Sequence, residues 1–228
     1  MTDVNTIITA PDTSSFKNQQ HTKNLTLYII RHGETDLNKR GIIQGRGINT
    51  DLNDHGRLQA ASFYEKYKEV PFEKIYTSSL KRTHQTVQKF IEGGLPWIQL
   101  PGLDELAWGI YEGKEGTLEN RAIFREMLEN WTKGDLHFKF EGGESPLEVK
   151  ERQLEALEEV MKFSDDNNVL ICMHGRAMRL FLCVLLDLPL SEMEKFPHQN
   201  TCLYKVHYDG FKFEIVDFNN IDHLKNLV

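Results

Sequence analysis

Two short apolar segments, far apart in the chain, each end in a histidine followed by a glycine. Residues 25–30 read LTLYII and lead into Arg31-His32-Gly33, while residues 169–173 read VLICM and lead into His174-Gly175. Each segment is apolar on both faces, as expected for a strand that is covered on two sides. Such strands lie at the centre of parallel sheets, whose strands are joined by helical crossovers.

The sequence between these segments supplies the helices. Asn53 or Asp54 suits the N-cap of one helix, and Ser78 or Ser79 suits the N-cap of the next. Residues 145–148 read SPLE, which is a capping box with proline at the first helical position. Each predicted helix follows or precedes a strand candidate, as crossovers in a parallel sheet require.

Further strands complete the predicted sheet. Residues 74–77 and 97–100 are short strand candidates, and Asp209-Gly210 separates two β-rich runs as a hairpin turn. Strands that alternate with helices favour parallel pairing, and a terminal hairpin adds an antiparallel edge. The sequence therefore predicts an α/β fold, a three-layer α/β/α sandwich with a mostly parallel sheet.

Composition limits the domain organisation and the partners. Residues 1–24 form a polar extension, and residues 25–228 are predicted to form a single domain with an aromatic-rich insertion at 106–143. The chain carries a net charge of −7 without a basic run, which disfavours nucleic acid and membrane surfaces as partners. Its three cysteines lie in apolar contexts that suit buried, reduced thiols. We expect a cytoplasmic protein.

Charged and titratable residues gather at the predicted strand ends. Ligands of open α/β sheets bind at the carboxyl ends of the strands, where His32 and His174 both lie. Arg31 precedes the first histidine, and Arg82 follows another predicted strand. Since arginine donors match phosphate oxygens, the four residues predict one anion pocket. The alternative is two buried structural histidines and two surface arginines paired with carboxylates.

Several motifs in a fixed order carry a family resemblance. They are Arg31-His32-Gly33-Glu34-Thr35 with Asn38, Gln44-Gly45, residues 52–60, residues 78–86, Leu103-Asp104-Glu105 with Glu112-Gly113, and Gly142-Gly143-Glu144-Ser145 followed by His174-Gly175. Together they resemble the histidine phosphatase superfamily, also called the phosphoglycerate mutase-like family. The motifs span most of the chain, and the departures are small: Asn53 stands where the family often has serine or threonine, and the segment before residue 25 has no counterpart.

The resemblance implies a phosphomonoester hydrolase of the histidine acid phosphatase type. His32 would be the nucleophile that forms a phosphohistidine, and Glu105 would be the general acid. Arg31, Arg82 and His174 would hold the phosphate oxygens and complete the catalytic set. The predicted substrate-binding residues are Arg31, Asn38, Gln44, Gly45, Arg82, His174 and Gly175. No cofactor is expected, and no His-x-x-x-His or Asp-rich loop supports a metal site, so the activity is predicted to be metal-independent.

Two alternative functions stay open. The family also contains cofactor-dependent phosphoglycerate mutases, but the segment after Glu105 lacks the many lysines and arginines of their insertion, which favours a phosphatase. A non-catalytic phospho-ligand-binding module should lack one of the catalytic residues, whereas this chain keeps all of them: Arg31, His32, Arg82, Glu105 and His174. The substrate is a small phosphate ester of open identity; Trp108, Tyr111 and Trp131 either line its entrance or form the core of the insertion, and a homodimer is left open.

Overall fold

The computed structural model describes residues 24–162, 167–225 and 227. The strands are β1 (Leu25–Arg31), β2 (Lys74–Thr77), β3 (Trp97–Gln99), β4 (Asn168–Met173), β5 (Leu203–Tyr208) and β6 (Phe213–Asn220). The helices are α1 (Asp36–Lys39), α2 (Asp54–Tyr67), α3 (Lys81–Glu92), α4 (Leu118–Thr132), α5 (Pro146–Lys162) and α6 (Gly175–Leu185). Of the predicted polar extension 1–24, residues 1–23 lie outside the described residues.

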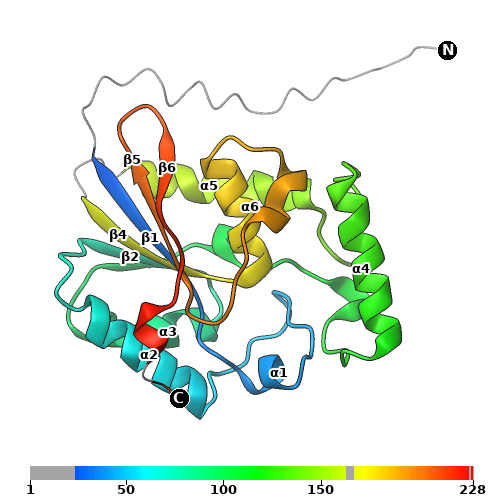
Figure 1. Cartoon of the computed structure of the whole chain (residues 1–228), viewed down its shortest axis with the longest axis horizontal. Helices are drawn as coiled ribbons and strands as arrows, with labels where there is room; N and C mark the ends of the chain where they lie inside the picture. The colour runs from blue at the N-terminus through cyan, green and yellow to red at the C-terminus, as the bar shows by residue number, and fades with distance from the viewer. Residues whose placement is uncertain (1–23, 163–166, 226, 228) are drawn as a thin grey trace.

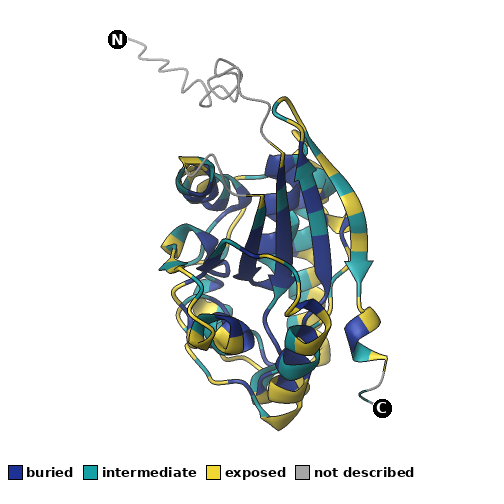
Figure 2. Cartoon of the chain, turned by 90° about the vertical axis from the view of Figure 1, so that its left-hand side faces the viewer, coloured by how far each residue is buried: buried dark blue, intermediate teal, exposed yellow. Residues whose placement is uncertain are grey.

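One mixed sheet in the order β3-β2-β4-β1-β5-β6 organises the molecule (Figure 1). Strands β3, β2, β4 and β1 are parallel neighbours, while β5 pairs antiparallel with β1 and β6 pairs antiparallel with β5. The four central strands are buried, and the outer strand β6 is partly exposed (Figure 2). The predicted mostly parallel sheet with an antiparallel edge is therefore confirmed.

Side chains alternate across β1 and build a core on each face of the sheet. Leu27 and Ile29 point into the larger core, which includes residues of α5 and α6. Tyr28 and Ile30 point into the smaller core, which includes residues of α2 and α3. This period of two is the ordinary consequence of strand geometry. Helices thus cover both faces, which confirms the three-layer arrangement.

Local capping explains most helix starts, with one correction. The Asn53 side chain accepts from the backbone N–H of Gly56 at the start of α2, and Ser145 and Glu148 form the predicted capping box of α5. The prediction that Ser78 or Ser79 caps α3 is wrong, because Leu80 is the N-cap and no side chain caps this helix. The hydroxyl of Ser79 instead donates to the carboxylate of Asp104, and that of Ser78 bonds to His174, as described below.

The predicted insertion packs into the main core. Trp108 and Trp131 are buried and stacked, with ring centroids 6.0 Å apart, and the indole of Trp131 donates to the carbonyl of Phe138. Both belong to the same apolar cluster as the residues of β1. The interpretation of these tryptophans as insertion core is therefore confirmed, and the shared core supports our proposal that residues 25–228 form one domain.

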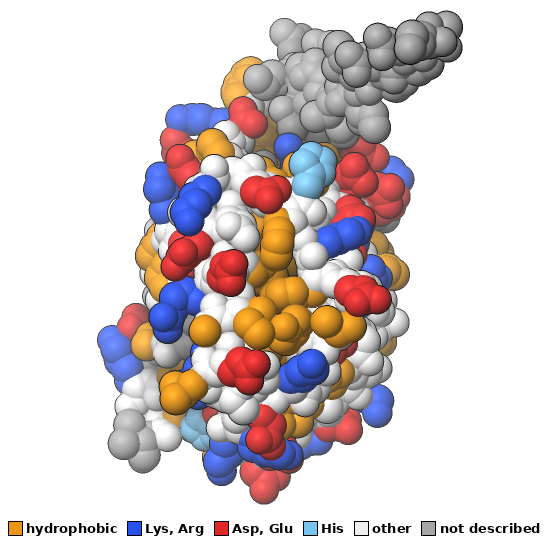
Figure 3. Space-filling view, turned by 90° about the vertical axis from the view of Figure 1, so that its right-hand side faces the viewer, with side chains coloured by type: hydrophobic (Ala, Val, Ile, Leu, Met, Phe, Trp, Pro, Cys, Tyr) orange, Lys and Arg blue, Asp and Glu red, His pale blue; other side chains and the backbone are white. Residues whose placement is uncertain are grey.

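The surface on the side of α4 is mixed in charge. Figure 3 shows acidic and basic side chains interspersed around a central hydrophobic patch on this face. It therefore lacks the continuous basic surface that nucleic acids require. The cysteines Cys172, Cys183 and Cys202 are buried and free, as predicted from their apolar contexts. None of the helices in the described ranges is both long and apolar enough to cross a bilayer.

Candidate active site

The sheet register brings the two predicted histidines together. Strands β1 and β4 are parallel neighbours in which Arg31 pairs with Met173, so the next residue of each strand is a histidine. The backbone N–H of His32 donates to the carbonyl of Met173 over 3.0 Å. The imidazole rings of His32 and His174 lie 5.1 Å apart between centroids, and both are buried. The two rings are therefore neighbours at the strand ends, as predicted, while an anion pocket shared by them stays a prediction.

A backbone carbonyl fixes the tautomer of His32. Nδ1 of His32 lies 2.7 Å from the carbonyl oxygen of Gly33, and a carbonyl can only accept, so Nδ1 carries the proton. Nε2 therefore keeps its lone pair, as a nucleophile must. Burial, and next the charges of Arg82 and Arg31, hold the pKa of His32 well below its usual value. The imidazole is accordingly neutral in the physiological pH range.

Arg82 is fully buried and is held by neutral acceptors. Its Nε donates to Nδ1 of His174 over 3.2 Å, and its terminal nitrogens donate to the carbonyls of Ile48 and Gly45 over 2.7 and 3.3 Å. Burial lowers the pKa of Arg82 to about 10, and the nearby Glu105 opposes this shift. The guanidinium therefore remains cationic near neutral pH and has a fixed orientation.

His174 uses both ring nitrogens inside the protein. Because Arg82 can only donate, Nδ1 of His174 is the acceptor and Nε2 carries the proton. Nε2 then donates to the hydroxyl of Ser78 over 2.7 Å. Burial lowers the pKa of His174 well below its usual value, with the charge of Arg82 as the next cause. In this arrangement His174 orients Arg82, while the predicted contact of His174 with a phosphate oxygen stays a prediction.

Arg31 lies at the carboxyl end of β1, directly before His32. Its Nη1 lies 3.2 Å from Nδ1 of His198, a residue in the loop before β5. Its Nε is buried and has no hydrogen-bond partner among the described residues. An unsatisfied buried donor is costly, so this atom suits an anionic acceptor placed in the pocket. Burial lowers the pKa of Arg31 but the group is an arginine and stays charged.

The side chain of Glu105, a residue between β3 and α4, is buried against the start of α6. Its Oε1 accepts from the backbone N–H groups of Leu106 and Ala177, and its Oε2 accepts from that of Arg176. These backbone donors fix the orientation of the Glu105 carboxyl group. Glu105 also acts electrostatically on both Arg31 and Arg82. Glu105 therefore lies near both arginines, and its role as a proton donor stays a prediction.

An ion-pair network braces the segment that carries Glu105. The guanidinium of Arg152, on α5, donates to the carbonyls of Gly102, Asp104 and Glu105. It also pairs with Glu144, whose carboxylate accepts from the backbone of Ala107. Helix α5 therefore holds Glu105 in place through its neighbours.

The remaining predicted contacts lie in the wall of the site. The Gln44 amide links the hydroxyls of Thr35 and Thr50, each over 2.7 Å. Oδ1 of Asn38 accepts from the backbone N–H of Thr35 and from the side-chain amide of Asn200. The same side-chain amide also donates to the backbone carbonyl of His32. These side chains brace the loop around His32, and their direct contact with phosphate stays a prediction.

Two predicted glycines fit their surroundings for steric reasons. At Gly45 a side chain would collide with the carboxylate of Glu112, while the Gly45 carbonyl accepts from Arg82. At Gly175 a Cβ would lie 2.6 Å from the imidazole of His198. Both positions therefore need glycine for close packing. Their predicted role in substrate binding is not tested by this packing.

Two supporting residues were not predicted in their observed roles. Ser78 was predicted as a helix cap, but its hydroxyl accepts from His174. Because Ser78 directly follows β2, its position among the strand ends could have been predicted from the sequence. His198 sits in a loop with no periodic or motif signal, so only the tertiary contact with Arg31 reveals it.

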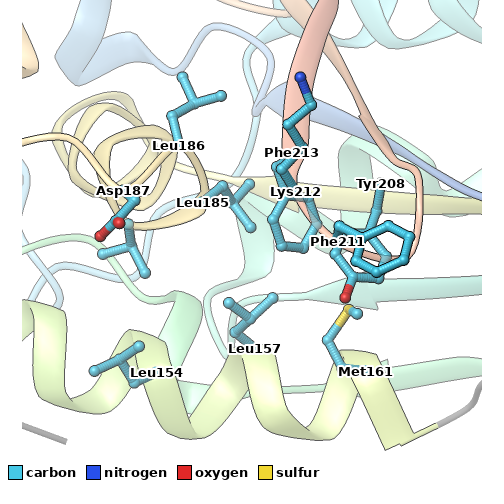
Figure 4. A pocket seen from close by; sticks show the side chains of 11 residues that line it. Leu154, Leu157, Met161, Leu185, Leu186, Asp187, Tyr208, Phe211, Lys212 and Phe213 are labelled. Atoms are coloured by element: carbon cyan, nitrogen blue, oxygen red, sulfur yellow. The ribbon is translucent and has the colours of Figure 1, made fainter. Parts of the chain in front are cut away.

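An apolar pocket lies away from these residues. Leu154 and Leu157 of α5, Leu185 of α6, and Tyr208 and Phe213 of the β5–β6 hairpin line it (Figure 4). Tyr208 pairs with Leu25, the first residue of β1, whereas His32 follows the last residue of that strand. The pocket is therefore at the opposite end of the sheet from the histidines. Within the described ranges, no three His, Cys, Asp or Glu side chains group as metal ligands.

Comparison with known proteins identifies the family. A model of the histidine phosphatase superfamily (branch 1) matches residues 27–221. The chain belongs to the histidine phosphatase superfamily. Phosphoserine phosphatase 1 of Hydrogenobacter thermophilus is 29% identical over 201 residues, which cover 87% of this chain and 93% of that protein. The family resemblance inferred from the motifs is thus confirmed.

Relatives with mutase names are similarly close. The protein named "Probable phosphoglycerate mutase GpmB" of Cronobacter sakazakii is 32% identical over 187 residues, covering 81% of this chain and 85% of that protein. Among solved structures, phosphoserine phosphatase of Entamoeba histolytica in complex with 3-phosphoglyceric acid superimposes with a TM-score of 0.75 at 26% identity. That match covers 88% of this chain and 99% of the other, and it confirms the phosphoglycerate mutase-like fold.

Proposed function

We propose that this member of the superfamily hydrolyses phosphate monoesters of small metabolites through a phosphohistidine on His32. The observation that carries the proposal is the hydrogen bond from Nδ1 of His32 to the carbonyl of Gly33, which leaves Nε2 as a free nucleophile. Membership of the superfamily and the phosphatase names of several relatives support the same reaction.

The proposed reaction has two balanced steps. In the first, Nε2 of His32 attacks phosphorus, the bond from phosphorus to the ester oxygen breaks, and Glu105 gives its proton to the departing alcohol. In the second, Glu105 takes a proton from a water molecule that attacks the phosphohistidine. Inorganic phosphate leaves, His32 is neutral again and Glu105 is protonated again.

Arg31 and Arg82 supply the electrostatic part of the proposed mechanism. The transferred phosphoryl group keeps its negative charge throughout, so fixed cations reduce the repulsion of the nucleophile and stabilise the transition state. Arg82 is held rigidly by His174, Ile48 and Gly45, and the buried Nε of Arg31 is a donor that a phosphate oxygen would satisfy.

We also propose that the activity is metal-independent and extends into the acid range. The arginines provide positive charge, and a neutral His32 needs no deprotonation by a metal or a base. Because burial holds the pKa of His32 below its usual value, the nucleophile stays uncharged in mildly acidic solution. A cytoplasmic location and a homodimer are further expectations, to be checked by cell fractionation and light scattering.

The substrate class is proposed from the relatives. Those named above are a phosphoserine phosphatase and a phosphoglycerate mutase, so phosphoserine and 3-phosphoglycerate are the first compounds to test. The experiment measures phosphate release from a panel of these two acids, sugar phosphates and α-ribazole phosphate, with EDTA present and His32→Ala as control. Release by the native protein alone supports the proposal, and full loss in EDTA with recovery on adding a divalent ion contradicts metal independence.

The same experiment separates the alternatives. A mutase primed with bisphosphoglycerate would interconvert phosphoglycerate isomers faster than it releases phosphate. A phospho-ligand-binding module would bind phosphate esters without turning over any of them. Either outcome would replace the phosphatase proposal.

A further inference from the structure

A neutral imidazole, and not a carboxylate, holds the guanidinium of Arg31. Nη1 of Arg31 lies 3.2 Å from Nδ1 of His198. Arginine nitrogens donate and never accept, so Nδ1 of His198 is the acceptor and the proton of this imidazole is on Nε2. The bond therefore exists only while His198 is uncharged.

Packing keeps His198 in this position. The imidazole lies directly against Gly175, the first residue of α6, so closely that a Cβ at that glycine would be 2.6 Å from Cε1 of the ring. Burial, followed by the charges of Arg31, Arg179 and Arg176, lowers the pKa of His198 to about 2. The ring is thus neutral and is fixed between Arg31 and the start of α6.

Carboxylates pair with other arginines nearby. Arg176 and Arg179, on α6, both form ion pairs with Glu194, which lies in the short helical segment Leu190–Lys195. Among the described residues, no ion pair involves Arg31 or Arg82. The two arginines of the site are therefore oriented by acceptors that carry no net charge.

We propose that His198 is a positioning residue that orients Arg31 toward the phosphate group without forming an ion pair with it. This inference rests on the phosphatase function proposed above. A carboxylate in the same place would orient Arg31 equally well but would cancel the field that a phosphate dianion needs. A neutral acceptor supplies orientation without that loss.

An isosteric pair of substitutions separates orientation from charge. His198→Asn and His198→Asp both place an oxygen acceptor near the position of Nδ1, and they differ only in charge. His198→Asn should keep kcat/KM within about threefold of the native value, whereas His198→Asp should lower it by about tenfold to a hundredfold. His198→Ala, which removes the acceptor, should also lose about tenfold to a hundredfold because Arg31 is no longer held.

Binding of inorganic phosphate gives a readout that does not depend on turnover. Its inhibition constant should rise for the Asp and Ala variants and stay near the native value for the Asn variant. Circular dichroism and thermal unfolding of all three variants check that each is folded. If His198→Ala fails to fold, the His198→Asn and His198→Asp pair still decides the charge argument through the inhibition constant of phosphate.

The outcomes distinguish the two proposals. If the native protein hydrolyses no ester, the proposed function has failed and His198 is irrelevant to it. If the native protein is active and folded Asn and Asp variants lose activity equally, His198 acts only through packing and the charge argument is overturned. Activity of all three variants near the native level would likewise overturn it.

Discussion

Arg82 donates from Nε to Nδ1 of His174, and this one bond sets the proton positions in the centre of the site. With Nδ1 occupied as an acceptor, the proton of His174 is on Nε2, which donates to Ser78. The chain of three residues joins α3, α6 and the end of β2. It fixes the guanidinium of Arg82 without adding a negative charge beside it.

The link to Ser78 predicts a coupled loss of stability and activity. Ser78→Ala leaves the buried Nε2–H of His174 without its acceptor, so the free energy of unfolding should fall by about 1–3 kcal/mol. Phosphatase activity should fall as well, since Arg82 loses its fixed support. Urea unfolding and steady-state kinetics measure the two effects. Thr132→Ala, at an exposed hydroxyl at the end of α4, is the control and should change neither.

His32→Ala should abolish both turnover and covalent labelling. A phosphohistidine is labile in acid and stable in base, so protein trapped with labelled substrate should carry phosphate with that behaviour. The label should disappear in His32→Ala and persist in His137→Ala, where an exposed histidine is removed. Labelling that survives in His32→Ala would place the nucleophile on another residue.

Glu105→Gln should affect poor leaving groups most. An alkyl alcohol leaves badly without a proton, while a nitrophenolate leaves readily. In single-turnover phosphorylation of His32, the variant should therefore lose about 10²–10⁴-fold with an alkyl phosphate and clearly less with p-nitrophenyl phosphate. The exposed Glu141→Gln serves as control. Equal losses with both esters would mean that Glu105 only shapes the site, with Glu34 and Asp104 as the next candidates.

The pH dependence of kcat/KM should lack an acid limb from an ordinary histidine. Burial lowers the pKa of His32, so its uncharged form persists below about pH 6.5 and is lost only when the pH falls through the lowered value. As the pH falls below the ordinary histidine value of about 6.5, the nucleophile should therefore stay competent, and its titration should not lower kcat/KM there. A decline centred near pH 6.5, beyond the decline caused by protonation of the substrate phosphate near about pH 6, would show that His32 titrates normally.

Much of the architecture was predictable from the chain. The apolar runs 25–30 and 169–173, the capping signals at Asn53 and Ser145 and the Asp209-Gly210 turn are local properties, and they predict central strands, helices and a terminal hairpin. The rule that parallel strands end at one edge placed His32 beside His174. The match between arginine donors and phosphate oxygens added Arg31 and Arg82 to the predicted pocket, and the ordered motifs then indicated the family and added Glu105.

The tertiary structure decided how these residues are connected. Arg82 and His174 are 92 positions apart, His174 and Ser78 are 96 apart, and Arg31 and His198 are 167 apart. Hydrogen bonds over such separations depend on angles and distances that no local sequence pattern encodes. For this reason the sequence predicted Ser78 only as a helix cap and did not indicate His198 at all. The sequence by itself determined which chemical groups reach the strand ends. Only the packed fold determined which nitrogen of each histidine carries the proton and which acceptors orient each arginine.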